Sequence, residues 1–362
     1  MNISGIGIVF TRGRGIERYA DALQQGWIPP SPGVPYNGIE NFGGLPQYRV
    51  EDDVIKDKAV LRKLRRADRF SKMAALSAWD AVQDSGISSD GSDVTGIIVA
   101  TAWGPHVTTS RFLDDILDYG EAGVSPTIFS NSVHNAAVAY ISLLLNTRGP
   151  TLTVTQFSFP FQQALILARA WLDEERCDRV LLGCVEERGP VMEYIYSQKL
   201  NIAGDGKIRP FHFSESPRAL PGEGSVFFMI TREPSPGNYC EISEVSFSHG
   251  AILRESSPDI CILDADGMAP DERMYQDAVT RDVYTAGYAP VFGSMMVGSG
   301  FHCAAAALML KNQIRYACPV QENPHDLLLC TRTEEAEIRE ICCVKCDSDH
   351  GNGVIRLIRE PP

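Results

Sequence analysis

Long apolar runs and an excess of positive charge are both missing from this chain of 362 residues. No stretch approaches the roughly 20 consecutive apolar residues that cross a bilayer. The first ten residues also lack the charged leader and small-residue cleavage site of a signal peptide. We therefore expect a cytoplasmic protein without a membrane span. The formal net charge of −13, from 33 Lys and Arg against 46 Asp and Glu, argues against a nucleic-acid binder.

A disulfide framework, a metal site and a nucleotide cofactor are not indicated either. Ten cysteines in a chain of this length, without an export signal, are better interpreted as reduced thiols. Cys342, Cys343 and Cys346 lie close together, but no second Cys/His pair at zinc spacing follows them. Residues 297–301 lack the lysine of a P-loop, and residues 11–15 lack the full dinucleotide-binding pattern.

What the chain does contain is typical of a globular protein, with 44% hydrophobic and 22% charged residues. Apolar and β-branched runs predict strands at residues 1–10, 95–101, 151–157, 179–185, 226–230, 239–248, 260–265, 327–330, 341–346 and 354–358. Apolar residues at helical spacing predict helices at residues 14–26, 68–86, 109–119, 136–145, 164–172, 272–285 and 302–313. This alternation predicts an α/β architecture with largely parallel sheets.

Residues 149–175 hold the motif around which the other segments are arranged. Residues 151–157 have the composition of a buried strand, and Pro160 stands where the first turn of the next helix begins. Ser158 is at the apex of the tight corner between them. A helix N-terminus favours negative charge, and enzymes place nucleophiles at such corners. Ser158 is therefore a candidate nucleophile.

Five segments resemble, in their order and spacing, the β-ketoacyl-acyl-carrier-protein synthases of the thiolase fold: residues 2–26, 66–81, 125–137, 149–159 and 209–230. The chain is most similar to the shorter, divergent branch that includes ketosynthase-like and chain-length-factor subunits of aryl polyene and type II polyketide systems. The resemblance implies a dimer, and two duplicated α/β halves in a five-layer αβαβα arrangement. We assign residues 1–232 to the first half and residues 238–362 to a shortened second half.

The resemblance also identifies where this chain departs from an active ketosynthase. Ser158 occupies the position of the cysteine that accepts the acyl chain. Asp266 and Ser299 occupy the positions of the two family histidines, and Ser294 that of the family lysine. The late Gly-Phe-Gly-Gly loop is reduced to residues 350–353. We call Ser158, Asp266, Ser294 and Ser299 the catalytic positions.

These substitutions remove the chemistry of condensation. A cysteine has a pKa of about 8.5 that a helix N-terminus lowers further, which yields a thiolate near neutral pH. A serine hydroxyl is far less acidic and needs a positioned base. An ionised Asp266 would repel the enolate that preorganised donors must stabilise. We therefore expect this chain alone not to catalyse decarboxylative condensation.

Two histidines keep an enzymatic interpretation open. His302 either acts as a general base for Ser158, with Asp266 as its orienting carboxylate, or packs at the start of a helix among small side chains. His134 either lines an acyl tunnel or braces the helix that follows it. The first role of His302 would make the chain a serine acyltransferase or thioesterase.

Three phenylalanines and a basic segment raise the question of partners. The phenylalanines around the corner either belong to the core or limit an acyl tunnel, as the floor-forming residues of a chain-length factor do: Phe157, Phe159 and Phe161.

The resemblance implies an acidic acyl carrier protein as a partner. Four basic residues offer a binding site for it: Arg62, Lys63, Arg65 and Arg66. The same four residues also fit a plain solvated helix face.

Three functions remain open from the sequence. The first is a catalytically silent ketosynthase-like subunit that pairs with an active ketosynthase and shapes the growing acyl or polyene chain. The second is an acyltransferase or thioesterase that uses Ser158. The third is a homodimeric acyl-binding protein without a catalytic partner. No cofactor is implied by any of them.

Overall fold

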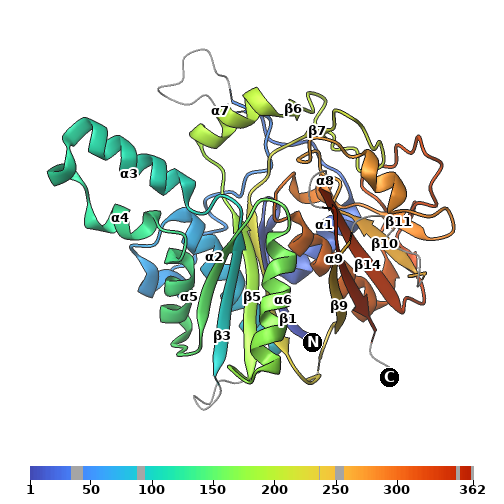
Figure 1. Ribbon diagram of the computed structural model, residues 1–362, viewed down its shortest axis with the longest axis horizontal. Coiled ribbons are helices and arrows are strands. Elements are labelled where there is room, and N and C mark those ends of the chain that lie inside the picture. Colours follow the sequence, from blue (N-terminus) through green and yellow to red (C-terminus); the bar gives the residue numbers. More distant parts are fainter. Residues whose placement is uncertain (34–43, 88–93, 236, 249–256, 348–350, 360–362) are drawn as a thin grey trace.

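The computed structural model describes residues 1–33, 44–87, 94–235, 237–248, 257–347 and 351–359. Strands and helices alternate along the chain, and the strands of its two halves meet edge to edge (Figure 1). The predicted α/β class is therefore confirmed.

The first half contributes five long strands: β1 (Asn2–Phe10), β3 (Thr95–Thr101), β4 (Thr151–Thr155), β5 (Arg179–Glu186) and β8 (Gly224–Thr231). They lie in the order β4-β3-β5-β8-β1. β3 is parallel to both β4 and β5, whereas β8 is antiparallel to both β5 and β1. The sheet is thus mixed, not largely parallel as the sequence predicted.

The second half repeats this pattern with β9 (Cys240–Ser248), β10 (Ile260–Leu263), β11 (Tyr284–Ala286), β14 (Glu340–Asp347) and β15 (Gly351–Ile358). Their order, β11-β10-β14-β15-β9, matches that of the first half strand for strand, with the same parallel and antiparallel neighbours. The halves join where Asn2 and Ile3 pair with Glu241 and Cys240. The strand order therefore supports the duplication, while the exact boundaries at residues 232 and 238 stay a prediction.

Two helices form a layer between the halves, α6 (Pro160–Asp173) and α9 (Gly298–Asn312), and each contacts strands of both halves. The outer face of the first half is covered by α2 (Arg69–Ser85) and α5 (Ala136–Leu145). Along β3, Ile98 joins the core around the middle helices, whereas Ile97 joins the core under α2 and α5. Because both faces of the strand are covered, its side chains are apolar on both sides.

The predicted helix at residues 68–86 is confirmed with its end signals. Asp68 caps the N-terminus of α2 by accepting a hydrogen bond from the backbone N–H of Ser71 at 2.9 Å. Gly86 ends the helix in the left-handed conformation, with φ 60°. Gly7 of β1 lets α2 pack closely on the sheet, because a Cβ there would lie 2.0 Å from the carbonyl oxygen of Ser77.

The second half has no counterpart of α2 among its described residues. Only residues 249–259, 11 in number, separate β9 from β10, which is too few for a helix of 17 residues. The short 3-10 helix η3 (Arg273–Asp277) lies against β14 instead. Its Tyr275 is fully buried, donates a hydrogen bond to the carbonyl oxygen of Asp264 at 2.6 Å and accepts one from the N–H of Cys346 at 3.0 Å.

Three predicted elements are wrong in extent or setting. The helix expected at residues 272–285 is reduced to η3, because Tyr275 holds this segment to β10 and β14 and the chain then extends into β11. The strand expected at residues 327–330 is only a single bridge between Thr285 and Leu329. The strand expected to be buried at residues 151–157 is β4, which forms the exposed edge of the sheet and ends at Thr155.

Two further helices, α3 (His106–Tyr119) and α4 (Pro126–Ser132), project from the body of the molecule (Figure 1). In the described part of the chain, no single helix has the length and apolar character of a membrane crossing, and α4 and α5 pass such a test only as a pair bent by 98°. The remaining elements are α1 (Ile16–Gln25), η1 (Val60–Leu64), η2 (Glu121–Gly123), α7 (Pro190–Lys199), α8 (Ala289–Phe292), β2 (Gly13–Arg14), β6 (Asn201–Ile202), β7 (Arg218–Ala219), β12 (Ile314–Arg315) and β13 (Glu334–Glu335).

Candidate functional site

The corner predicted around Ser158 is present. β4 ends at Thr155, α6 begins with Pro160 in its first turn, and Ser158 lies between them with 7% of its surface exposed. Pro160 fits the first turn because the backbone N–H that it lacks would have no partner within the helix. The corner therefore holds a nearly buried serine at the N-terminus of α6.

The three phenylalanines around this corner point to different surroundings. Phe157 is 54% exposed, and its ring lies 4.8 Å from that of Trp103 at the edge of the sheet. Phe159 is buried against Phe247, with a ring distance of 5.3 Å. Phe161 is fully buried in the core between the halves. Phe159 and Phe161 are thus core residues, and only Phe157 remains open to a partner or ligand.

A buried polar cluster lies behind the corner, where α6, α9, β10 and β14 meet. The Ser299 hydroxyl donates to Asp264 Oδ2 at 2.7 Å, and Lys345 Nζ donates to the same oxygen at 3.0 Å. Gln162 of α6 donates from Nε2 to Ser299 Oγ at 2.9 Å. The His302 Nδ1 atom lies 3.4 Å from Asp264 Oδ1. We call these five buried residues the Asp264 cluster.

The Asp264 cluster is held as an ion pair. Burial alone would raise the pKa of Asp264, but Lys345, His302 and Ser299 together lower it. Burial would likewise lower the pKa of Lys345, but Asp264 and Asp266 raise it. Both groups therefore stay charged near neutral pH. Because a buried charge without its partner is costly, removal of either one would destabilise the fold by about 3–5 kcal/mol.

His302 is not positioned as a general base for Ser158. Its Nε2 atom accepts a hydrogen bond from the backbone N–H of Tyr288 at 3.1 Å, so the ring proton is on Nδ1, beside Asp264. The ring is fully buried against Phe292, with a ring distance of 5.2 Å. The predicted pairing of His302 with Asp266 is thus contradicted, because Asp264 takes that place.

Asp266 and Ser294 join two loops of the second half. The Asp266 carboxylate accepts hydrogen bonds from the N–H groups of Met268 at 3.0 Å and Met295 at 2.9 Å. Ser294 Oγ donates to the carbonyl oxygen of Asp266 and accepts from the N–H of Leu220 at 2.9 Å. Burial raises the pKa of Asp266 to about 6. At these two catalytic positions the side chains hold backbone in place.

His134 lies apart from the Asp264 cluster. It is exposed, its carbonyl oxygen accepts a hydrogen bond from Thr153 of β4 at 3.3 Å, and its ring packs over Gly104. The first helical turn of α5 is preceded by Asn135 and has no side-chain cap. His134 therefore stands at the exposed sheet edge, beside a helix that it does not cap.

The most informative residues of this site, Lys345, Asp264 and Gln162, were not singled out from the sequence. Lys345 interrupts the run Cys342 to Cys346, which is otherwise a buried apolar strand. A lysine at such a position requires an anionic partner. That signal was available in the sequence, but it did not identify Asp264 as the partner.

The three neighbouring cysteines of β14 do not converge. Successive residues of a strand face opposite sides of its sheet, so Cys342 and Cys346 share one face and Cys343 takes the other. Within the described ranges, no group of three or more His, Cys, Asp or Glu side chains is arranged to hold a metal ion. The late loop of the family begins at His350, which lies outside the described residues, while its Gly353 packs against the ring of Phe159.

Sequence comparison finds a match to a known family over part of the chain. Residues 52–203 match the family described as "Beta-ketoacyl synthase, N-terminal domain". A 3-oxoacyl-[acyl-carrier-protein] synthase 2 of Staphylococcus aureus is 29% identical over 118 residues, which is 32% of this chain and 28% of that protein. The match thus spans less than a third of the curated relative's length.

Structural comparison covers nearly the whole chain. The ishigamide ketosynthase/chain length factor has a TM-score of 0.81 at 16% identity, and a β-ketoacyl synthase of Burkholderia phymatum has a TM-score of 0.83 at 14% identity. A type II PKS acyl-carrier protein in complex with its ketosynthase gives a TM-score of 0.79 at 14% identity. Each likeness covers 99% of both chains. The chain therefore has the thiolase-type fold of these solved ketosynthases.

Proposed function

We propose that this chain is a catalytically silent, chain-length-factor type subunit that pairs with an active ketosynthase and helps to shape its acyl tunnel. One observation carries the proposal: the polar side chains at three of the catalytic positions make buried hydrogen bonds that stabilise the fold. Ser299 belongs to the Asp264 cluster, and Asp266 and Ser294 hold loop backbone. No thiol stands at the corner, and the Nε2 atom of His302 already accepts a hydrogen bond from the N–H of Tyr288, while its Nδ1 atom lies 3.4 Å from Asp264 Oδ1.

This arrangement opposes both steps of a condensation. Ser158 lacks the low pKa that makes cysteine a nucleophile at neutral pH, and His302 offers it no free lone pair. The developing enolate would need neutral or cationic donors, whereas Asp266 presents a carboxylate that already accepts two N–H groups. The same geometry counts against a serine acyltransferase, since that mechanism also requires the missing base.

The exposed edge of the first half supports pairing with a second subunit. Among the described residues β4 pairs only with β3, so its other edge has unpaired backbone groups. Leu152 on β4 is 45% exposed, and Leu143 on the neighbouring α5 is 57% exposed. With the exposed Phe157 they form an apolar surface beside an open strand, which suits antiparallel addition of a partner strand.

Phe157 is the one of the three corner phenylalanines that fits a tunnel-shaping role. Its exposed ring stands at this same edge, supported by Trp103. A partner bound along β4 would place its own surface against that ring. We therefore assign the boundary of the partner's acyl tunnel to Phe157, and not to the buried rings of Phe159 and Phe161.

A basic surface near η1 supports a carrier partner. A groove of about 430 Å³ has an apolar floor of Ile55, Leu61 and Leu64 and a rim of five cations, Lys56, Lys58, Arg62, Arg65 and Lys72, together with Asp57, which is paired with Arg14. We call it the basic groove. Within the described part of the chain none of these five rim cations forms an ion pair. In a chain of net charge −13, such a concentration of unpaired cations suits an acidic partner with an apolar contact face.

Charge reversal in the basic groove tests the carrier contact. The double substitution Arg62→Glu and Arg65→Glu is expected to weaken binding of an acyl carrier protein by about tenfold or more at low salt. Reversal of Arg18, an exposed arginine outside the groove, is the matched control. Equal carrier affinity in the two variants would remove the groove from the proposal.

Co-expression tests the proposed pairing. We expect a one-to-one complex with a cysteine-bearing ketosynthase from the same source, and loss of that complex in Leu152→Lys. Leu328→Lys changes an exposed leucine of the second half and should leave the complex intact. Recovery of only homodimers, with no affinity for the ketosynthase, would favour the homodimeric acyl-binding protein instead.

A further inference from the structure

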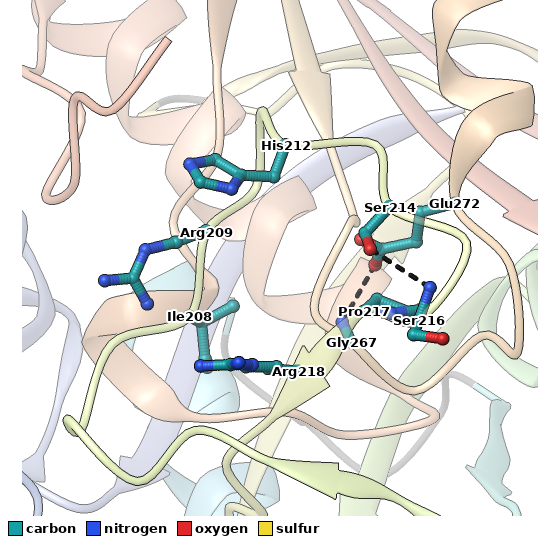
Figure 2. Close-up of a pocket in the computed structure, with 9 residues that line it drawn as sticks. All are labelled: Ile208, Arg209, His212, Ser214, Ser216, Pro217, Arg218, Gly267 and Glu272. Atoms are coloured by element: carbon teal, nitrogen blue, oxygen red, sulfur yellow. Dashed lines mark hydrogen bonds between the residues drawn. The ribbon is translucent and has the colours of Figure 1, made fainter. Parts of the chain in front are cut away.

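A polar cavity of about 350 Å³ lies between the segment that leads into β7 and the loop that follows β10 (Figure 2). It is separate from the corner, since neither Ser158 nor any member of the Asp264 cluster lines it. Figure 2 shows Arg209, His212 and Arg218 along one side of the cavity and Ser214, Ser216 and Glu272 along the other. Its volume is in the range of small-molecule sites.

Arg218 supplies the uncompensated charge of this cavity. It is exposed, and its guanidinium forms no ion pair or hydrogen bond within the part of the chain that the structure describes. Arg209 differs, because it is paired with Asp205 at 2.5 Å and with Glu322 at 2.6 Å. The charge of Arg209 is thus balanced, whereas that of Arg218 is available to a ligand.

The opposite wall offers hydrogen-bond donors. Ser214 Oγ accepts a hydrogen bond from the N–H of Ser216 at 3.0 Å, which leaves its hydroxyl proton to donate. Glu272 is 3% exposed and accepts from the N–H of Gly267 at 2.8 Å. Burial raises the pKa of Glu272 to about 8, so its carboxyl group is mostly protonated at pH 7. A protonated carboxyl group donates a hydrogen bond and does not repel an anion.

We propose that this cavity binds a small phosphate ester, whose phosphoryl group contacts Arg218 and accepts hydrogen bonds from Ser214, Ser216 and Glu272. A phosphoryl group suits these donors because it has several acceptor oxygens and matches the planar fork of arginine. The cavity is larger than inorganic phosphate requires, so it has room for the organic part of an ester. The proposal is independent of the pairing function proposed above.

The cavity has a direct structural link to the Asp266 loop. Glu272 binds the N–H of Gly267, the neighbour of Asp266, and Asp266 in turn holds Met268 and Met295. Gly267 has a φ of 86°, and a Cβ there would lie 2.4 Å from the backbone of Arg218. Both walls of the cavity therefore meet at Gly267, and a ligand that bridges them stabilises this loop.

The ionisation of Glu272 gives the site a predictable pH dependence. The titratable and charged groups around it are Asp264, Asp266, Tyr275, Lys345 and Cys346 on the protein side, and Arg209, His212 and Arg218 in the cavity. As the pH rises through about 8, Glu272 acquires a negative charge that opposes an anion. Anion affinity therefore falls between pH 7 and pH 9, and Glu272→Gln removes that fall.

Calorimetric titration of the 362-residue chain with glycerol 3-phosphate and with inorganic sulfate tests the proposal. We expect saturable binding of both anions at pH 7, tighter for the ester, and a loss of about tenfold or more in Arg218→Ala. Arg18→Ala is the matched control and should bind as the wild type does. Sulfate keeps its charge from pH 7 to pH 9. Any change in sulfate affinity over this range therefore reflects a change in the charge of the protein.

Three results would overturn the proposal. They are the absence of saturable binding by the wild type up to millimolar concentrations, unchanged affinity in Arg218→Ala, and equal losses in Arg218→Ala and Arg18→Ala. Ester binding no tighter than sulfate binding would overturn the assignment to an ester. Thermal unfolding of each variant without ligand establishes that it is folded, and retained binding in Glu272→Gln with a flat pH profile would support the assigned role of Glu272.

Discussion

The two halves of this chain have the same strand order but are stabilised in different ways. In the first half, α2 and α5 cover the outer face of the sheet through an apolar core. In the second half, the described segments replace that cover with η3 and its bridging Tyr275, and the interior contains the Asp264 cluster. The outer cover of the first half is thus an apolar helical layer, whereas that of the second half depends on a tyrosine that hydrogen-bonds to the backbone of two segments.

Lys345→Met removes the buried cation of the second half, and of the substitutions that change stability it is expected to have the largest effect. It leaves Asp264 buried without its cation, so we expect a loss of about 3–5 kcal/mol in the free energy of unfolding, measured in urea. Asp264→Asn added to Lys345→Met removes the orphaned charge and should recover part of that loss. A single variant as stable as the wild type would show that the ion pair is not structural.

Buried carboxyl groups make the stability of both halves depend on pH, and Glu186 of the first half can be compared with Glu272 of the second. Burial raises the pKa of Glu272 to about 8 and that of Glu186 to about 7. Because both folded values exceed the unfolded value of about 4.3, stability is greatest below that value and is lost as the pH rises through 7 and 8. A pKa difference of one unit corresponds to about 1.4 kcal/mol, so we expect the free energy of unfolding to fall by several kcal/mol from pH 5 to pH 8.5.

Two variants show how much each carboxyl group contributes to this pH dependence. Glu272→Gln should flatten the profile more than Glu186→Gln, because the pKa of Glu272 is shifted further. Urea unfolding at several pH values gives the comparison. Stability that increases from pH 5 to pH 8.5 in the wild type would contradict the raised pKa values.

Tyr275→Phe tests the cover of the second half. It removes the hydroxyl that bridges Asp264 and Cys346 and leaves a buried carbonyl and a buried N–H without that partner. We expect a loss of about 1–2 kcal/mol in unfolding free energy. Faster hydrogen exchange at the N–H of Cys346 would locate the effect, and unchanged exchange there would contradict it.

Asp68→Ala tests the cover of the first half and has the smallest expected effect. It removes the N-cap of α2 and the side-chain hydrogen bond from Thr108 at 2.8 Å, at a cost of about 1 kcal/mol. Asp68→Ser keeps a capping oxygen and should recover most of the loss. Equal losses in the two variants would show that capping is not the cause.

The sequence predicted the elements whose signals are local. The end signals of α2 and the strand-to-helix corner before Pro160 were identified correctly, because capping residues, glycine and proline act over a few residues. The mixed sheet and the exposed edge position of β4 were missed, since strand neighbours depend on tertiary pairing. The helix predicted through Tyr275 failed because two long-range hydrogen bonds outweigh helical periodicity there.

The contacts of the candidate site could not be predicted from the sequence. Motif alignment selected Asp266 and Ser294, whose loops the structure joins by hydrogen bonds, while a shared site with Ser158 stays a prediction. The partner of His302 is Asp264, only two residues from the expected Asp266, and neighbouring residues of a loop face different surroundings. That distinction depends on side-chain direction, which a single sequence does not specify.

The most direct test of the central claim, that the catalytic positions serve the fold and not condensation, is an extension assay on the purified chain alone. The wild type and Ser158→Cys are incubated with an acyl carrier thioester and malonyl thioester, and products are detected by mass spectrometry. We predict no extended product from either protein, because a restored thiol still lacks a base and enolate donors. Extension by the wild type, or by Ser158→Cys, would contradict the claim.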